Sequence, residues 1–340
     1  MIAIDMDGTL LGLDGQVSPR NLAALRAAEA AGIEVVVATG RRHSYAMRVL
    51  RPLGLHHANA LVSSNGAVTR TIGSANTTST LLDRALLPHA TSAWLLNHLS
   101  GVGDHNLRNA LVLTFDRVGP DGEDTRGALV VEHLDELHSS IGRWMQANEP
   151  YIAHIDPLEG ALVNDDASPE APIQMMLCGT IARMARAEAR LLEHPNIAAS
   201  GHQPVHSGAP PQTVLSSEVG SRTSSGPMGS HHLTLHRTEY PDRDLSILDI
   251  LPAGCSKGAA LLRLAERRGL HASQILAIGD NWNDVPMLEI AGRAVLMANA
   301  PDDLKAHAAT RNWHIGPSHD LDGVAAAIES TLETTLTAAC

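Results

Sequence analysis

The segment Ile2-Ala3-Ile4-Asp5-Met6-Asp7-Gly8-Thr9-Leu10 decides the fold that we expect for this chain. Three apolar residues are followed at once by two carboxylates and a glycine, which is typical of a buried strand that ends in a polar turn. Residues 5 and 7 lie on the same side of an extended strand, and a turn at Asp7, made possible by Gly8, can bring the second carboxylate over the first. One carboxylate could then attack a substrate while the other transfers protons.

Alternating helix and strand patterns follow this segment. We expect a helix over 19–31, because Ser18 can cap its free N–H groups, Pro19 is tolerated at the first helical position and Gly32 ends it. This order of elements is typical of a βαβ unit. The strands predicted here are 33–37 and 60–63.

The same alternation returns near the end of the chain. Few polar residues interrupt its strand-like runs, as expected for parallel strands that helices cover on both faces. The two distant segments therefore predict one α/β domain with a doubly wound, Rossmann-like parallel sheet. The elements expected in the second segment are helix 257–268, strand 275–278, helix 284–291, strand 294–297 and a terminal helix near 321–336.

Residues 85–247 have a different pattern, which predicts an α+β domain inserted into the core formed by 1–84 and 248–340. Within the insert, 206–230 is rich in Ser, Gly, Pro and Thr and predicts a long mobile loop. The elements expected in the insert are helix 88–99, strands 109–116 and 127–132, helix 135–147, strand 172–178, helix 180–193 and strands near 231–239 and 245–251.

The composition limits the possible classes of function. The net charge of -12 over 340 residues argues against a general nucleic-acid or anionic-membrane surface, because each needs a basic field. Cys178, Cys255 and Cys340 are odd in number and lack paired spacing, which indicates reduced thiols. Met1 leads straight into an apolar strand without room for a signal segment, and no apolar run is long enough to span a bilayer. We therefore expect a cytoplasmic protein.

Three more polar clusters follow apolar strands or begin helices. Thr39, in Ala38-Thr39-Gly40-Arg41, could hold phosphate oxygens together with nearby N–H groups. Lys257 begins a helix and can neutralise both carboxylates and a phosphate. Asp280 and Asp284 offer hard oxygen ligands, which suit Mg²⁺. Each cluster alone is also typical of a polar turn, but strand ends of a parallel sheet share one edge, so together they predict a single site.

The motifs Asp-x-Asp-Gly-Thr, Thr-Gly-Arg, Ser-Lys-Gly and Gly-Asp-x-x-Asn-Asp occur in this order and resemble those of the haloacid-dehalogenase-like superfamily. Asn65-Gly66-Ala67, Leu248-Asp249-Ile250 and Asp322-Gly323-Val324 resemble its Cof-type branch, which carries a type IIB cap. The bulky Trp282 departs from the small or polar residue usual inside the last motif. The resemblance implies a Mg²⁺-dependent phosphatase whose inserted domain is the cap.

The resemblance also implies a role for each matching residue. Asp5 would be the nucleophile that becomes phosphorylated and Asp7 the general acid/base, while Thr39 and Lys257 would position the phosphate and the nucleophile. Asp280 would bind Mg²⁺ together with Asp5 and the Asp7 carbonyl, and Asp284 would support the metal through water. The phosphate contacts implied are Asp5, Thr39, Gly40, Asn65, Lys257 and Asn283.

Other functions stay open from the sequence. A phosphosugar mutase shares the motifs and the cap type, so it is one alternative to a phosphatase. A catalytically silent phosphate-binding module is a second alternative. A true dehalogenase is disfavoured, because its reaction needs neither the magnesium-binding acids nor an acid like Asp7. We expect a small sugar or polyol phosphate as substrate ahead of a flavin or pyridoxal phosphate, because the cap has few aromatic residues. A zinc site is disfavoured because the candidate histidines lack regular ligand spacing with cysteines. These histidines are His202, His206, His231, His232 and His236.

Overall fold

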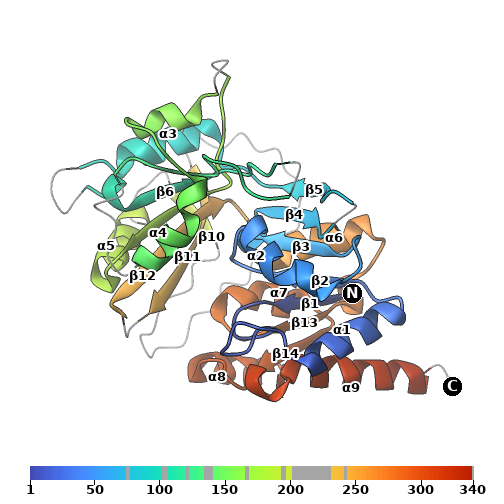
Figure 1. Ribbon diagram of the computed structural model, residues 1–340. Coiled ribbons are helices and arrows are strands. Elements are labelled where there is room, and N and C mark those ends of the chain that lie inside the picture. The colour runs from blue at the N-terminus through green and yellow to red at the C-terminus, as the bar shows by residue number, and fades with distance from the viewer. Residues whose placement is uncertain are drawn as a thin grey trace.

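The computed structural model places the chain in two β-sheets with helices packed against each (Figure 1). Both termini belong to the part built around the eight-stranded sheet, and the middle of the chain forms the part built around a seven-stranded sheet (Figure 1). The structure describes residues 1–73, 77–101, 106–119, 122–133, 141–164, 168–192, 197–200, 231–240 and 243–338.

The eight-stranded sheet has the order β15-β14-β13-β1-β2-β3-β4-β5. Its first six strands run parallel, and the last two continue the sheet antiparallel. β1 lies in the middle of the sheet. Its first three residues are apolar, and all four of its residues, including Asp5, are buried. The strands are β1 (Ile2–Asp5), β2 (Val35–Ala38), β3 (Ala60–Ser63), β4 (Val68–Thr71), β5 (Leu81–Arg84), β13 (Leu276–Gly279), β14 (Arg293–Met297) and β15 (His314–Gly316).

Helices cover both faces of the central strands, which explains why β1, β2, β3 and β13 are buried on both sides. One face packs against α1 (Pro19–Ala30), α2 (His43–Leu50) and α9 (Gly323–Ala338). The other packs against α6 (Lys257–Arg267), α7 (Val285–Ile290) and α8 (Asp302–Thr310). At the start of α1 the Ser18 hydroxyl accepts a hydrogen bond of 3.0 Å from the Asn21 N–H, as its position before Pro19 predicts.

The seven-stranded sheet has the order β10-β11-β12-β9-β6-β7-β8. α3 (His89–His98) and α5 (Ile181–Leu192) share an apolar cluster with one of its faces, and α4 (Gly142–Asn148) lies beside a second cluster. The strands are β6 (Leu111–Thr114), β7 (Leu129–Val131), β8 (Ile152–His154), β9 (Gln174–Gly179), β10 (Ile197–Ser200), β11 (His231–Tyr240) and β12 (Leu245–Pro252).

The predicted fold class is confirmed: an α/β core with a largely parallel sheet carries an inserted α+β unit. β12 continues in the seven-stranded sheet as far as Pro252, beyond the predicted start of the second core segment at residue 248, and the division of the chain stays a prediction. The predicted loop 206–230 and the first part of the predicted helix 135–147 lie outside the described residues. Several elements of the structure were not predicted from the sequence, namely α2, α8, β4, β5, β8, β10 and β15.

Neither a long apolar helix nor a disulfide is found in the described part of the chain. No helix there has both the length and the apolarity needed to cross a membrane. Cys178 and Cys255 are buried free thiols, and burial raises the pKa of the Cys255 thiol to about 12. Both thiols are therefore protonated at neutral pH, and Cys340 lies outside the described residues.

Candidate active site

The predicted site residues meet at one edge of the eight-stranded sheet. Asp5 ends β1, where it lies opposite Ala38 at the end of β2, and Ile4 lies opposite Ile278 near the end of β13. Thr39 and Asp280 each follow one of these neighbouring strands directly. The parallel register therefore places the first, second and fourth motifs side by side, as expected for the carboxyl ends of parallel strands.

Lys257 connects two carboxylates at the centre of this edge. Its Nζ donates hydrogen bonds to Asp5 Oδ1 and, at 2.6 Å, to Asp284 Oδ1. The side chain is completely buried. Gly258 allows the start of α6 to pack closely against the start of α7, because a Cβ on Gly258 would lie 2.1 Å from the Pro286 carbonyl oxygen. The Ser-Lys-Gly motif is thus explained by a cap, a buried cation and a close backbone contact.

Asp284 uses both carboxylate oxygens to organise the loop after β13. Its Oδ2 accepts hydrogen bonds of 2.9 Å from the Asp280 N–H and 3.0 Å from the Asn281 N–H. Gly279 leaves room for this side chain, since a Cβ there would lie 2.6 Å from the Asp284 Cβ. The loop therefore holds Asp280 in a fixed position beside Asp5.

Asp5, Asp280 and Asp284 form a group that could hold a cation. One carboxylate oxygen from each lies within 4.8 Å of the others, and no other group of this kind was found among the residues described. Burial and then the Asp284 charge raise the pKa of Asp5 well above its usual range, and the same two causes raise that of Asp280 to about 7. One lysine does not neutralise three acids, and the oxygen donors are those that Mg²⁺ prefers, so the residues fit the implied metal.

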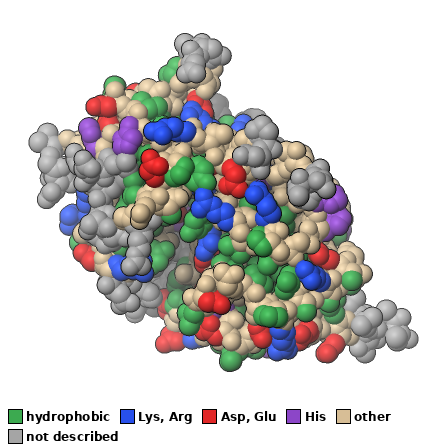
Figure 2. Space-filling view, in the orientation of Figure 1, with side chains coloured by type: hydrophobic (Ala, Val, Ile, Leu, Met, Phe, Trp, Pro, Cys, Tyr) green, Lys and Arg blue, Asp and Glu red, His purple; other side chains and the backbone are tan. Residues whose placement is uncertain are grey.

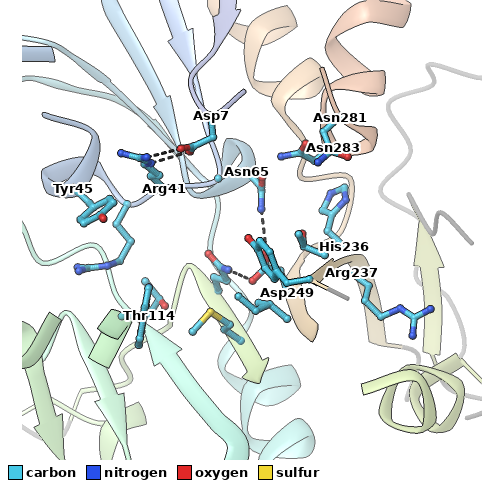
Figure 3. A pocket seen from close by; sticks show the side chains of 18 of the residues that line it. Asp7, Arg41, Tyr45, Asn65, Thr114, His236, Arg237, Asp249, Asn281 and Asn283 are labelled. Carbon is cyan, nitrogen blue, oxygen red and sulfur yellow. Dashed lines mark hydrogen bonds and ion pairs between the residues drawn. The ribbon is translucent and has the colours of Figure 1, made fainter. Parts of the chain in front are cut away.

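The Asp7 carboxylate does not join this group. It forms a two-point ion pair with Arg41, in which Arg41 Nε donates to Asp7 Oδ2 at 2.8 Å (Figure 3). More than half of the Asp7 side chain is exposed. Gly8 brings the backbone close to the metal group instead, since it has φ +75° and a Cβ there would lie 2.4 Å from Asp280 Oδ2. The Asp7 side chain is thus not part of the acidic group, and a metal contact through the Asp7 carbonyl stays a prediction.

Thr39, Gly40 and Asn65 form the neighbouring part of the edge. The Thr39 hydroxyl accepts a hydrogen bond of 3.1 Å from the Arg41 N–H, and the Thr39 carbonyl accepts one of 3.1 Å from the Asn65 N–H. Asn65 has φ +53°, and a Cβ on Gly40 would lie 3.0 Å from its Oδ1. These contacts tie the Thr-Gly-Arg loop to the Asn-Gly turn, whose Gly66 packs against the Ser256 carbonyl.

A cavity of about 690 Å³ opens from this edge toward the seven-stranded sheet. Asp5, Gly40, Asn65 and Asn283 contribute to its core wall, so four of the predicted phosphate contacts line it. The opposite wall comes from β6, β9, β11 and β12 (Figure 3). The residues that line this wall include Thr114, Gln174, Met176, His236, Arg237, Thr238, Glu239, Tyr240, Ile247 and Asp249.

Asp249 joins the two walls of the cavity. Its Oδ1 accepts a hydrogen bond from the Gln174 amide and its Oδ2 accepts one of 3.1 Å from the Asn65 amide (Figure 3). Burial is the largest cause that raises the pKa of Asp249, to about 7, while the Gln174 hydrogen bond acts in the opposite direction. Asp249 belongs to a motif that resembles the Cof-type branch, but the sequence predicts no role for it.

We expect Asp249→Asn to stabilise the protein at pH 8 and to have little effect at pH 4. Because the carboxyl pKa is higher in the folded state than in the unfolded state, its contribution to the free energy of unfolding falls as pH rises from about 4 to about 7. One pKa unit corresponds to about 1.4 kcal/mol, so the gain at pH 8 is at most about 4 kcal/mol. Thermal and urea unfolding in EDTA at both pH values measure it. A difference between variant and wild type that is independent of pH contradicts this account.

Buried ion pairs also connect the two parts of the molecule. Arg42, just before α2, donates to Asp124 and to Asn148, and Arg70 on β4 donates to Asp116 at 2.9 Å. Lys and Arg side chains gather where the two parts meet on the face shown in Figure 2. No sequence motif predicts these ion pairs, because the paired residues are far apart in the sequence.

The candidate zinc histidines do not form a described metal group. His236 is buried on β11 and lines the cavity, while His232 is exposed on the same strand. Burial lowers the pKa of His236 to about 4, so it is neutral at pH 7. His202 and His206 lie outside the described residues, as does the side chain of His231.

Comparisons with known proteins agree with this arrangement. The family described as haloacid dehalogenase-like hydrolase matches residues 2–103 and 233–328, the two segments that carry the motifs. The 5-amino-6-(5-phospho-D-ribitylamino)uracil phosphatase YwtE of Bacillus subtilis (strain 168) is 27% identical over 341 residues, with 97% of each chain covered. Phosphatase YwpJ of the same organism is 28% identical over 318 residues, which cover 90% of this chain and 92% of YwpJ.

A solved structure leads to the same family. A haloacid dehalogenase-like hydrolase from B. subtilis is 25% identical, with a TM-score of 0.65, 96% of this chain covered and 98% of that chain covered. The match extends over both sheets, since it leaves almost none of either chain out. The chain therefore belongs to the haloacid dehalogenase-like hydrolases, and its resemblance to their Cof-type branch is confirmed.

Proposed function

We propose that this chain is a Mg²⁺-dependent phosphatase that hydrolyses the phosphate ester of a small hydroxylated metabolite through an aspartyl phosphate on Asp5. The observation that carries the proposal is the buried arrangement of Asp5, Lys257 and Asp284 beside Asp280, at the end of a cavity large enough for a small metabolite. The names of YwtE and YwpJ as phosphatases support the reaction class. A cytoplasmic location stays a prediction.

In this mechanism Asp5 is the nucleophile. Its Oδ1 receives a hydrogen bond from Lys257, so one oxygen is held in place while the other can approach phosphorus. Attack forms the bond between Asp5 and phosphorus and breaks the bond to the leaving oxygen, and water later hydrolyses the resulting acyl phosphate. Mg²⁺ would be held by Asp5 and Asp280, with Asp284 supporting it through water, and would supply positive charge that offsets the repulsion between the Asp5 carboxylate and the phosphate.

Asp7 is the proposed acid for the leaving group and the base for the hydrolytic water. Its carboxylate faces the cavity rim rather than the metal group, and Arg41 holds it there. Because the pair is partly exposed, entry of a substrate can replace the Arg41 contact with one to the leaving oxygen at little cost. Thr39 and Asn283 would position the phosphate from the two neighbouring loops.

We expect EDTA to abolish phosphate release from a panel of sugar, polyol, flavin and pyridoxal phosphates, and Mg²⁺ to restore it. Mg²⁺ should also raise the Tm in the absence of substrate, because a ligand that binds only the folded state stabilises it by about 2.7 kcal/mol at about 100 times its Kd. Asp280→Asn should remove both effects, since it takes one charged ligand from the group. Isomerised product without free phosphate would instead indicate a mutase, and Mg²⁺ binding without turnover a regulatory module.

A further inference from the structure

The cavity wall opposite Asp5 contains a carboxylate, that of Asp249, for which the described residues provide no positively charged partner. Asp249 is buried between the two sheets, and its hydrogen-bond donors in the described part of the chain are the amides of Gln174 and Asn65. No ion pair of Asp249 with Lys, Arg or His is found within 4.0 Å among these residues. A carboxylate can accept about four hydrogen bonds, so each oxygen can accept one more.

The arginines that line the cavity are already paired with acids. Arg41 contacts Asp7, Arg42 contacts Asp124, and the Nε of Arg237 lies 3.1 Å from Glu188 while its Nη1 lies 3.3 Å from Glu239. A second anionic group on a substrate would have to compete with Asp124, Glu188 and Glu239 for Arg42 and Arg237, whose side chains are largely buried. The Arg41–Asp7 pair is partly exposed and opens more easily, but Arg41 follows β2 on the core wall and not on the wall that carries Asp249.

His236 does not supply the missing charge. It lies directly opposite Asp249 in the pairing of β11 with β12, and its Nε2 is buried without a hydrogen-bond partner. Burial, followed by the nearby charge of Lys257, lowers the pKa of His236, so the ring can exchange a hydrogen bond with a neutral group but does not attract an anion. Thr114 and Thr238 on the same wall are neutral, and Glu239 is paired with Arg237.

We propose that Asp249 is a specificity-determining residue that accepts hydrogen bonds from hydroxyl groups of the leaving group and excludes leaving groups that carry a second anionic charge. This inference rests on the proposed phosphatase function and adds a residue and a direction of selectivity to it. A hydroxyl donates to a carboxylate, whereas a second phosphate or carboxylate placed beside Asp249 would meet a like charge.

The test compares two substrates that differ only at the end remote from the phosphate. Sorbitol 6-phosphate ends in a hydroxymethyl group and 6-phosphogluconate in a carboxylate. At pH 8, above the pKa of about 7 of Asp249, we expect the wild-type enzyme, saturated with Mg²⁺, to favour sorbitol 6-phosphate by about tenfold or more in kcat/KM, because a hydrogen bond to a charged group contributes about 1.5–3 kcal/mol. p-Nitrophenyl phosphate, which lacks hydroxyl groups, reports on the reacting end of the site alone.

Asp249→Asn should reduce kcat/KM for sorbitol 6-phosphate by about tenfold to a hundredfold, and the preference over 6-phosphogluconate should largely disappear. Its loss of activity toward p-nitrophenyl phosphate, which reflects only the contact of Asp249 with Asn65, should be clearly smaller than its loss toward sorbitol 6-phosphate. Asp249→Glu, which keeps the charge, should retain the preference. The matched control is Asp244→Asn, an acid-to-amide exchange on the cap at φ +43° that keeps an acceptor for the Ile181 N–H and does not line the cavity.

The outcomes separate this inference from the proposed function. A wild-type enzyme that prefers 6-phosphogluconate overturns it, as does an Asp249→Asn variant that keeps the full preference. Equal losses on all three substrates in Asp249→Asn would show that Asp249 only holds the two sheets together through Asn65, and would also overturn it. If the wild-type enzyme releases phosphate from none of the three, the proposed phosphatase function itself fails on these substrates.

Discussion

Asp5→Asn lowers kcat for phosphate release by about 10⁴-fold or more, according to the proposed mechanism, because the amide is nearly isosteric with the carboxylate but is a poor nucleophile. Folding should be only modestly affected. The carbonyl oxygen of the introduced amide can still accept the hydrogen bond from Lys257, and the change removes a carboxylate that is costly because of its burial and the neighbouring Asp284 charge. Steady-state phosphate release and thermal unfolding measure the two effects.

A second readout tests the covalent step in this variant. Wild-type enzyme quenched during turnover should carry an acid-stable, alkali-labile phosphate that disappears in Asp5→Asn, since acyl phosphates have this lability. Asp14→Asn is the control, because it exchanges an exposed acid whose Oδ1 accepts only a local hydrogen bond from the Gln16 N–H. Normal turnover by Asp5→Asn would eliminate the proposed mechanism.

Much of the core could be predicted from the sequence because its signals are local. β1, β2 and β13 are short apolar runs that end in acids, a hydroxyl or glycine, and the Ser18 cap lies beside Pro19. β4 and β5 were missed because each is only four residues long and carries charged residues, so neither gives a clear strand pattern, and β4 gains its place in the sheet by pairing with both β3 and β5. α2 was missed because its first residues follow a motif that was interpreted as a phosphate-binding loop.

The position of a site residue could be predicted where the motif that contains it also determines the local structure. Lys257 begins a capped helix and points to the strand ends, so its role follows from its position. The pairing of Asp7 with Arg41 and the contact of Asp249 with Asn65 were not predictable, because each joins segments that only the tertiary fold brings together. The sequence around Asp249 predicts a buried strand residue. Its carboxylate lines a cavity only because segments distant in the sequence form the facing core wall.

Lys257→Met should both inactivate and destabilise the protein. The side chains have similar lengths, but methionine leaves Asp5 and Asp284 facing each other in a buried site without the ammonium that now donates to both. Removing one partner from a buried ion pair costs about 3–5 kcal/mol. The free energy of unfolding in EDTA should therefore fall by about this amount at pH 8, and turnover should fall by about 10³-fold or more because the nucleophile is no longer positioned.

The pH dependence and a double variant separate charge from packing. Without Lys257 the pKa of Asp5, which burial already raises, rises further, so the folded protein binds more protons than the unfolded protein and the loss of stability shrinks as pH falls toward 4. Lys257→Met combined with Asp284→Asn removes one of the facing charges and should recover about half of the lost stability or more without recovering turnover. The free energy of unfolding could instead fall equally at pH 5 and pH 8 and stay equally low in the double variant. Lys257 would then act through packing, and the account of the mechanism in which Lys257 neutralises the buried carboxylates would be wrong.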